Sequence, residues 1–267
     1  MRKTALVTGG SSGLGFALSK QLQSQGYDLI LIARDYDKLC AAKQKLNLLC
    51  ESTQIALYSC DLLDEDNMLK TFNEIYAKGT KIDFLVLNAG IVSINLLQDY
   101  GSLGEITRNI KINLLGAISS TYLSLPMLKA DSHILLVSSG FGMIGPAGYS
   151  LYAAAKAGII NFAEALRREL TSKKIRVHVT CPGDIDTPML QTELKIMPNW
   201  IKEKMGRAKP QNADYVATYV LKKCFKGQFM VIPSLDVKFL VLVNKLLPRV
   251  LYTFLGDRVL PLPPKNS

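Results

Sequence analysis

Short apolar runs alternate with longer amphipathic stretches along most of the chain, as far as about residue 232. The runs are rich in β-branched residues, which predicts strands at 5–8, 29–33, 55–58, 84–87, 134–138, 177–181 and 229–232. The stretches between them have helical spacing near 14–25, 37–50, 64–77, 104–129, 152–171 and 212–225. The sequence therefore predicts an α/β protein with a doubly wound parallel sheet of seven strands and helices on both faces.

Nothing in the sequence divides residues 1–235, because no linker, repeat or change of composition interrupts the alternation. Pro and Gly gather where predicted strands end, and loops at that edge of an open α/β sheet build a ligand crevice. We predict one domain over 1–235, with a substrate lid at about 187–211, followed by a separate tail over 236–267.

Composition and charge exclude several classes of protein. Apolar residues make up 48% of the chain and charged residues 20%, which is typical of a globular protein. The net charge of +10 comes without zinc-finger spacing or a base-reading basic helix, so no nucleic-acid partner is expected. Five scattered cysteines and two histidines predict reduced thiols and no metal site. The chain enters a strand pattern at once, with no signal-peptide pattern, which favours a cytoplasmic location.

A glycine-rich segment joins the first predicted strand to the first predicted helix. Glycines let the backbone approach a pyrophosphate, and the N–H groups at a helix start favour its negative charge. The alternative, a glycine-rich turn without a ligand, is less expected in this strand-to-helix context. The sequence predicts a dinucleotide site formed here by Gly9, Ser11, Ser12, Gly13, Leu14 and Gly15.

Tyr152 and Lys156 stand four residues apart in a predicted helix, and therefore on one face of it. A phenol with a pKa of about 10 is a poor acid–base catalyst at neutral pH, and a nearby positive charge is one way to lower that pKa. Lowering it by about three units takes roughly 4 kcal/mol. The pair alone occurs by chance in many helices; Tyr149, for example, is followed at the same spacing by Ala153.

Taken together, these motifs resemble the short-chain dehydrogenase/reductase family over about residues 3–232. The glycine loop has the spacing GxxxGxG, Asn88-Ala89-Gly90 ends the fourth predicted strand, and Cys181-Pro182-Gly183 ends the sixth. The resemblance implies a Rossmann-type fold, a nicotinamide cofactor, an oxidoreductase acting on CH–OH or C=O groups, and a homodimer or tetramer.

The resemblance also implies roles for individual residues. Ser139, thirteen positions before Tyr152, corresponds to the serine that hydrogen-bonds the substrate carbonyl, whereas Ser138 is expected on the opposite face of the strand. Asn113 corresponds to the asparagine that carries a proton-relay water to the lysine. The cofactor-binding residues implied beyond the glycine loop are Asp61, Leu62, Asn88, Ala89, Gly90, Tyr152, Lys156, Pro182, Gly183, Ile185 and Thr187.

The end of the second predicted strand bears on the choice of cofactor. An acidic residue there binds the free 2′-hydroxyl of NAD, but this chain has Arg34, with Lys38 one turn into the next helix. A guanidinium and an ammonium suit a 2′-phosphate, so the sequence predicts NADP(H). The adjacent Asp35 leaves NAD as the alternative.

The mechanism expected is hydride transfer from NADPH to a ketone held by Ser139 and Tyr152, with Tyr152 supplying the proton and Lys156 orienting the nicotinamide ribose. Apolar residues in the lid argue for a small hydrophobic ketone or alcohol. Within the family the chain resembles 3-ketodihydrosphingosine (3-dehydrosphinganine) reductases, which implies a lipid ketone of sphingolipid metabolism. The alternatives are a 3-oxoacyl, retinoid or steroid carbonyl reductase, or an NADP-binding sensor or scaffold without turnover.

The tail segment 236–256 is too apolar for an ordinary surface tail, yet cations and Pro248 interrupt it, so it is not expected to span a membrane. On a helix its cations fall on one face and its apolar residues on another, which predicts peripheral contact with the cytosolic face of a membrane. The alternatives are packing against a second subunit and capping of the substrate pocket. The cations are Lys238, Lys245 and Arg249, and the apolar residues are Phe239, Leu242, Val243, Leu246, Val250 and Phe254.

Overall fold

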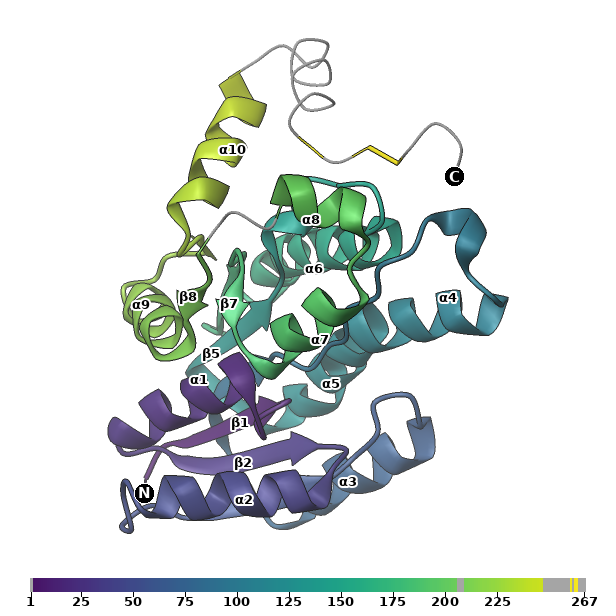
Figure 1. Cartoon of the computed structure of the whole chain (residues 1–267). Coiled ribbons are helices and arrows are strands. Elements are labelled where there is room, and N and C mark those ends of the chain that lie inside the picture. The colour runs from purple at the N-terminus through teal and green to yellow at the C-terminus, as the bar shows by residue number, and fades with distance from the viewer. Residues whose placement is uncertain (1, 206–208, 247–259, 261, 264–267) are drawn as a thin grey trace.

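The computed structural model describes residues 2–205, 209–246, 260 and 262–263, which form a seven-stranded sheet covered by helices on both faces (Figure 1). The sheet strands are β1 Thr4–Thr8, β2 Asp28–Ala33, β3 Ile55–Ser59, β4 Ile82–Leu87, β5 Leu128–Val137, β6 Arg176–Thr180 and β9 Met230–Val231. The α-helices are α1 Gly13–Ser24, α2 Tyr36–Asn47, α3 Glu65–Ala77, α4 Leu103–Ile110, α5 Gly116–Ser124, α6 Ser150–Glu169, α7 Pro188–Ile196, α8 Asn199–Met205, α9 Ala213–Phe225 and α10 Leu235–Leu246. The predicted fold class is confirmed.

All neighbouring strands of the sheet are parallel, and their order is β3-β2-β1-β4-β5-β6-β9. The chain builds outward from β1 through β2 to β3, then returns to the other side of β1 with β4. Such a reversal leaves a crevice at the carboxyl ends of the strands, because the loops after β1 and β4 diverge to opposite faces. The site described below lies at this switch point.

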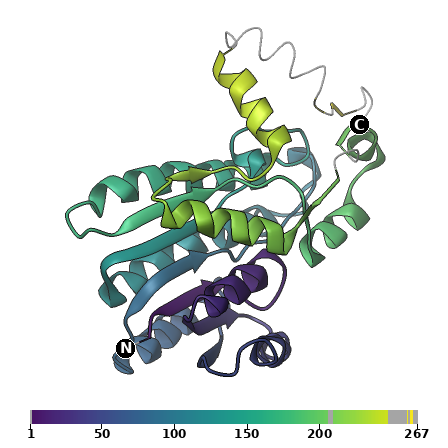
Figure 2. The same ribbon diagram turned by 90° about the vertical axis from the view of Figure 1, so that its left-hand side faces the viewer.

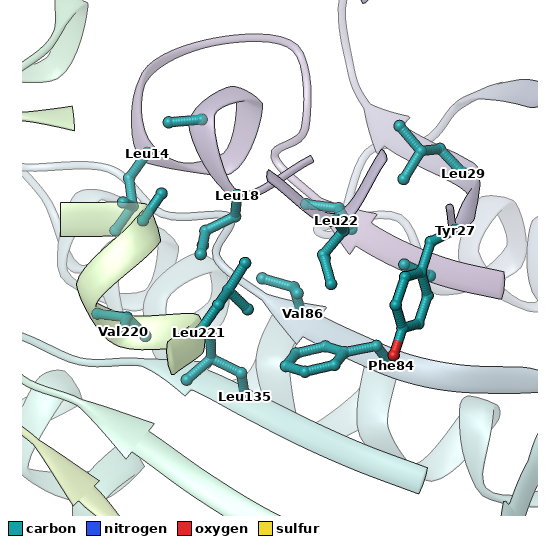
Figure 3. Packing of buried hydrophobic residues seen from close by; sticks show 14 of the residues in the cluster. Leu14, Leu18, Leu22, Tyr27, Leu29, Phe84, Val86, Leu135, Val220 and Leu221 are labelled. Carbon is teal, nitrogen blue, oxygen red and sulfur yellow. The ribbon is translucent and has the colours of Figure 1, made fainter. Parts of the chain in front are cut away.

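Two hydrophobic cores cover the two faces of the sheet. The side chains of α1 and α9 pack on one face, where Leu14, Leu18 and Leu22 meet Val220 and Leu221 (Figure 3). The second core lies on the opposite face and includes buried side chains of α3, α5 and α6. Because both faces are covered, the strands are apolar throughout rather than alternating, as the sequence pattern predicted.

The stretch 104–129, expected as one helix, is divided in the structure. α4 is followed by a π-helical turn at Lys111–Leu115 and then by α5, which ends at Ser124, two residues before Pro126. β5 then begins at Leu128, six residues earlier than expected. Its first residues include Lys129 and Asp131, so apolar periodicity could not reveal them; Ser132 ties them to the sheet by donating to the carbonyl of Ile82 at 2.8 Å.

Two further elements lie beyond the sheet. A two-stranded pairing of β7 (Ile185–Asp186) with β8 (Gln211–Asn212), not expected from the sequence, brings together the two ends of the segment that was predicted as a lid. α10 projects from the body of the fold (Figure 2) and confirms the first half of the predicted tail helix. Pro248, Arg249, Val250 and Phe254 lie outside the described residues. Within the described part of the chain, no helix is long and apolar enough to cross a membrane.

Candidate active site

A cavity of about 520 Å³ opens at the carboxyl ends of the strands. It gathers residues that are far apart in the sequence, from the loop after β1 to the start of α10. Of the residues predicted to be catalytic or to bind the cofactor, Gly15 alone does not line it. Those that do are Gly9, Ser11, Ser12, Gly13, Leu14, Arg34, Lys38, Asp61, Leu62, Asn88, Ala89, Gly90, Asn113, Ser139, Tyr152, Lys156, Pro182, Gly183, Ile185 and Thr187.

The loop between β1 and α1 is shaped by its glycines. Gly9 has φ +68°, which L side chains rarely adopt, and a Cβ there would lie 2.8 Å from the Asn88 amide nitrogen. The same amide donates to the Gly9 carbonyl at 3.2 Å, so Asn88 ties the loop to the end of β4. A Cβ on Gly15 would collide with the Gly9 carbonyl, so Gly15 supports the turn from beneath. The resulting backbone cradle at the start of α1 fits a pyrophosphate.

The groups expected near the adenosine ribose lie at the start of α2. Asp35 is the N-cap of this helix: one carboxylate oxygen accepts from the Lys38 N–H at 3.0 Å, and the other pairs with the Lys38 ammonium at 3.1 Å. These hydrogen bonds lower the pKa of Asp35. Arg34 is exposed and forms no ion pair with a described residue. Both oxygens of Asp35 are therefore engaged within the protein, while the Arg34 guanidinium is available.

The two candidate serines at the end of β5 have different surroundings. Ser138 is buried, and its hydroxyl donates to the Lys156 carbonyl at 2.8 Å, which holds α6 against the strand. The Ser139 oxygen accepts from the Phe141 N–H at 3.2 Å, which leaves its O–H able to donate into the cavity. The geometry therefore favours Ser139 as the group that contacts a carbonyl oxygen.

Tyr152 and Lys156 lie on one turn of α6, with the ammonium 5.6 Å from the phenol ring centroid. Burial lowers the pKa of Lys156 to about 8, and its ammonium donates to the Val137 carbonyl at 2.9 Å. The pKa of Tyr152 is raised, first by burial and then by the negative charge of Glu193, while Ser139 opposes this. The lowering expected from Lys156 is therefore not found among the protein's own groups, since burial and a nearby carboxylate outweigh it.

Asn113 lies in the π-helical turn between α4 and α5. Its side-chain oxygen accepts from the Ile91 N–H at 2.9 Å, and its amide donates to Asn109 at 3.2 Å. A Cβ on Gly90 would lie 2.8 Å from this oxygen and 3.6 Å from the Lys156 ammonium. Gly90 thus lets Asn113 and Lys156 approach one another, and π turns are frequent at functional sites.

The loop after β6 lines the cavity and approaches the glycine loop, since a Cβ on Gly13 would lie 3.3 Å from Thr187. The Pro182 carbonyl accepts from the Gly140 N–H at 2.8 Å, and the Gly183 N–H donates to the Ser234 hydroxyl at 2.8 Å. Thr187 is the N-cap of α7, and its hydroxyl donates to the Ile185 carbonyl at 3.2 Å. Thr187 therefore has a structural role in addition to the cofactor contact predicted for it.

A buried pair that the sequence did not reveal lies beside Tyr152. Tyr149 is 0% exposed, and its hydroxyl donates to Glu193 of α7 at 2.6 Å. Burial and the carboxylate both raise the pKa of Tyr149. One signal was present: Leu190, Glu193 and Met197 follow helical spacing, so an acid stands in the stripe that α7 turns inward.

Comparisons with known proteins agree with this geometry. Residues 3–196 match the family model of the short chain dehydrogenases. A 3-dehydrosphinganine reductase of Arabidopsis thaliana is 34% identical over 226 residues, which are 83% of this chain and 65% of that protein. A 3-oxoacyl-[acyl-carrier-protein] reductase of Bos taurus is 36% identical over 191 residues, 71% of this chain and 78% of that one.

A solved structure shares the fold over nearly the whole length. The short-chain dehydrogenase/reductase of Burkholderia phymatum in complex with NAD superposes with a TM-score of 0.79 at 19% identity, covering 99% of this chain and 98% of that one. The match of the family model to most of the chain and the identity to the two reductases together show that this chain belongs to the short-chain dehydrogenase family of oxidoreductases.

Proposed function

We propose that the chain is an NADPH-dependent carbonyl reductase that acts on an apolar or lipid ketone. The observation that carries this proposal is the convergence of Ser139, Tyr152 and Lys156 with the glycine loop on one cavity. A protein that only senses NADP has no need of a phenol, an ammonium and a serine hydroxyl gathered in one cavity. The alternative of a sensor or scaffold is therefore less well supported.

The protein's groups have separate tasks in this reaction. NADPH supplies the hydride that reduces the carbonyl carbon. The Ser139 hydroxyl donates to the carbonyl oxygen, and the Tyr152 phenol gives its proton to the same oxygen as negative charge develops there. Lys156, whose pKa burial lowers to about 8, holds its ammonium beside the Tyr152 ring and stabilises the phenolate left by that transfer. It also orients the nicotinamide ribose.

The preference for NADPH over NADH is supported by the engagement of Asp35. Its two oxygens cap α2 and pair with Lys38, so they are poorly placed to accept from a free ribose hydroxyl. Arg34 offers donors suited to a phosphate, and the Lys38 ammonium adds a second charge.

The best candidate for the substrate is 3-ketodihydrosphingosine, reduced to dihydrosphingosine. Apolar side chains line part of the cavity near Tyr152, which favours a long hydrocarbon chain over a sugar. The similarity to a 3-dehydrosphinganine reductase supports the same substrate, while the similarity to a 3-oxoacyl reductase supports a 3-oxoacyl thioester as the alternative. The apolar lining residues include Phe141, Ile144, Met189, Leu190, Val237 and Leu240.

We also propose that α10 touches the cytosolic surface of a membrane, from which a lipid ketone enters the cavity. One face of α10 packs against the body of the fold, because Val237 and Val241 are buried. The opposite face exposes an apolar stripe, defined as Leu235, Phe239, Leu242 and Leu246, with Phe239 65% exposed. Lys238 turns toward the Tyr219 hydroxyl at 3.2 Å instead of joining a solvent-facing row of cations. A second subunit of a dimer or tetramer is the alternative occupant of the stripe.

Oxidation of NADPH over a panel of ketones tests the proposed function. The panel contains 3-ketodihydrosphingosine, a 3-oxoacyl thioester, a retinoid aldehyde and a steroid ketone, each with NADPH and with NADH. We expect turnover with NADPH and the highest kcat/KM for the long-chain ketones. Tight NADPH binding without turnover of any member would favour the sensor instead.

A further inference from the structure

The two ends of the cavity differ in charge. Arg34 and Lys38 lie with Asp35 and Asp61 at the end assigned to the cofactor, whereas three carboxylates, those of Asp184, Glu193 and Asp236, line the end beyond Tyr152. The described basic residues that line this second end are Lys156 and Lys204, which donate to the carbonyls of Val137 and Leu260. Neither forms an ion pair with the three carboxylates.

Of these three acids, Glu193 is the one whose carboxylate forms a hydrogen bond with a described side chain. It is half-buried, and the hydroxyl of the fully buried Tyr149 fixes one of its oxygens at 2.6 Å. Tyr149 is in turn packed against Phe141, with ring centroids 4.7 Å apart, and against the apolar residues of α8. The second oxygen of Glu193 forms no hydrogen bond with a described residue. A rigid, desolvated carboxylate with one free oxygen is thus presented next to the catalytic residues.

This arrangement is unfavourable for the protein alone. Burial raises the pKa of Glu193, the hydrogen bond from Tyr149 opposes this rise, and the neighbouring Asp184 adds to it. Its negative charge also raises the pKa of Tyr152, which opposes the proton transfer that the reaction requires. A cation bound between the two groups would remove both penalties at once, and no basic side chain among the described residues forms an ion pair with Glu193.

We propose that Glu193, held in place by Tyr149, binds a cationic ammonium group that the substrate carries close to its reacting carbonyl, so the preferred substrates are long-chain amino ketones. The inference rests on the proposed reductase function and narrows its substrate class. The amine takes no part in the chemistry: hydride passes from NADPH to the carbonyl carbon and a proton from Tyr152 to its oxygen, giving an amino alcohol and NADP⁺.

The inference separates the candidate substrates by chemistry. 3-Ketodihydrosphingosine carries an ammonium on the carbon next to its ketone, whereas 3-oxoacyl thioesters, retinoid aldehydes and steroid ketones carry no positive charge. A cationic substrate both gains a charge-assisted hydrogen bond and relieves the effect of Glu193 on Tyr152. The preference for a cationic ketone over a neutral one should therefore be seen in kcat as well as in KM.

Binding without turnover gives the first test. Trp200 is the one tryptophan in the sequence and packs in the same cluster as Tyr149, so its fluorescence reports occupation of this end of the cavity. We expect the full chain with NADP⁺ to bind dodecylammonium about tenfold or more tightly than 1-dodecanol. Glu193→Gln should abolish the difference, and Glu203→Gln, on the exposed face of α8, should preserve it.

Kinetics give the second test. The substrates are 3-ketodihydrosphingosine and the same ketone with hydrogen in place of the amino group. Glu193→Gln should lower kcat/KM for the amino ketone about tenfold or more and leave the neutral ketone unchanged or faster. Tyr149→Phe, which keeps the ring and removes the hydroxyl that fixes Glu193, should shift selectivity in the same direction by a smaller factor.

The outcomes separate this inference from the proposed function. If Glu193→Gln slows both ketones equally, or if the unsubstituted chain binds the ammonium and the alcohol alike, Glu193 is not an ammonium site and the reductase function stands. If no ketone is reduced while dodecylammonium still binds through Glu193, the reductase function is wrong and the ammonium site stands.

Discussion

The two ends of the cavity are built in different ways. At the cofactor end, Gly9 and Asn88 follow directly after β1 and β4, and Asp61 comes two residues after the end of β3, so the topology of the sheet brings them together. At the substrate end, Glu193 and Leu240 come from helices outside the sheet, and their positions depend on how α7 and α10 pack against the body.

Because of this difference, we expect the cofactor end to serve the reaction with every substrate and the substrate end to select among substrates. Groups on strand ends are held by ladder hydrogen bonds and by the buried core on each face, so their geometry is common to the fold. Groups on peripheral helices are held by a few local contacts, such as the hydrogen bond from Tyr149 to Glu193 and the contact of Val237 with Gly140. Changes at the first end should affect every substrate, and changes at the second should affect some.

The largest effect on turnover is expected for Tyr152→Phe. The change removes the proton that the developing alkoxide requires, so kcat should fall by at least about a hundredfold for every ketone, charged or neutral. The Kd for NADPH, measured by fluorescence, should stay near that of the unsubstituted protein. Tyr76→Phe, on the exposed side of α3, is the matched control. Near-normal turnover of Tyr152→Phe would show that another group is the acid.

Arg34→Ala should have the next largest effect, limited to the choice of cofactor. Loss of a charge-assisted contact with the 2′-phosphate should raise the KM for NADPH roughly 10- to 100-fold and leave the KM for NADH nearly unchanged. Lys45→Ala, on the exposed part of α2 away from the cavity, should change neither. An equal rise for both cofactors would contradict phosphate recognition by Arg34.

What the sequence could predict follows the same division. Most strand positions, the parallel sheet and the glycine loop could be predicted, because period and turn chemistry are local properties of the chain. The division of 104–129 could not, since the π turn and the polar start of β5 do not follow apolar spacing. The role of Tyr149 was also missed, because its partner Glu193 lies 44 residues away on a helix whose packing is not encoded locally.

A change inside the sheet but outside the cavity should alter stability and leave the site unaffected. His178 Nδ1 lies 2.7 Å from the Gln228 carbonyl and must donate to it, so its Nε2 accepts from His133 Nδ1 at 2.9 Å. The two rings stack with centroids 5.2 Å apart. Burial, reinforced by His178 and Arg176, lowers the pKa of His133 to about 4.

A lowered histidine pKa means that the unfolded chain binds protons at pH values where the folded chain does not. Stability from this site is therefore complete above about pH 6.5 and is lost as the pH falls toward about 4. Between pH 7.5 and 5 this site should lower the free energy of unfolding by about 2 kcal/mol. In urea titrations, His133→Leu should abolish this pH-dependent loss. Turnover per folded molecule at pH 7.5 should not change, and an unchanged pH slope would show that His133 does not titrate as inferred.

The smallest effect on catalysis is expected on the exposed face of α10. A form that ends at Asp236 would also lack Val237, which packs against Gly140 and Gly183 beside the cavity. Truncation therefore removes the buried face of α10 together with its exposed face. A triple variant in which Phe239, Leu242 and Leu246 are each replaced by Ser changes only the exposed stripe. We expect this variant to reduce a short, soluble ketone normally and to lose flotation with liposomes that contain anionic lipid.

Leu48→Ser is the matched control for that variant, because Leu48 is 86% exposed at the end of α2, remote from α10. Its flotation should equal that of the unsubstituted chain. Since a second subunit could also cover the stripe, sedimentation of both variants must be compared in the absence of lipid. If the triple variant floats as before, or only changes from an oligomer to a monomer, α10 is a subunit interface and the membrane proposal is wrong.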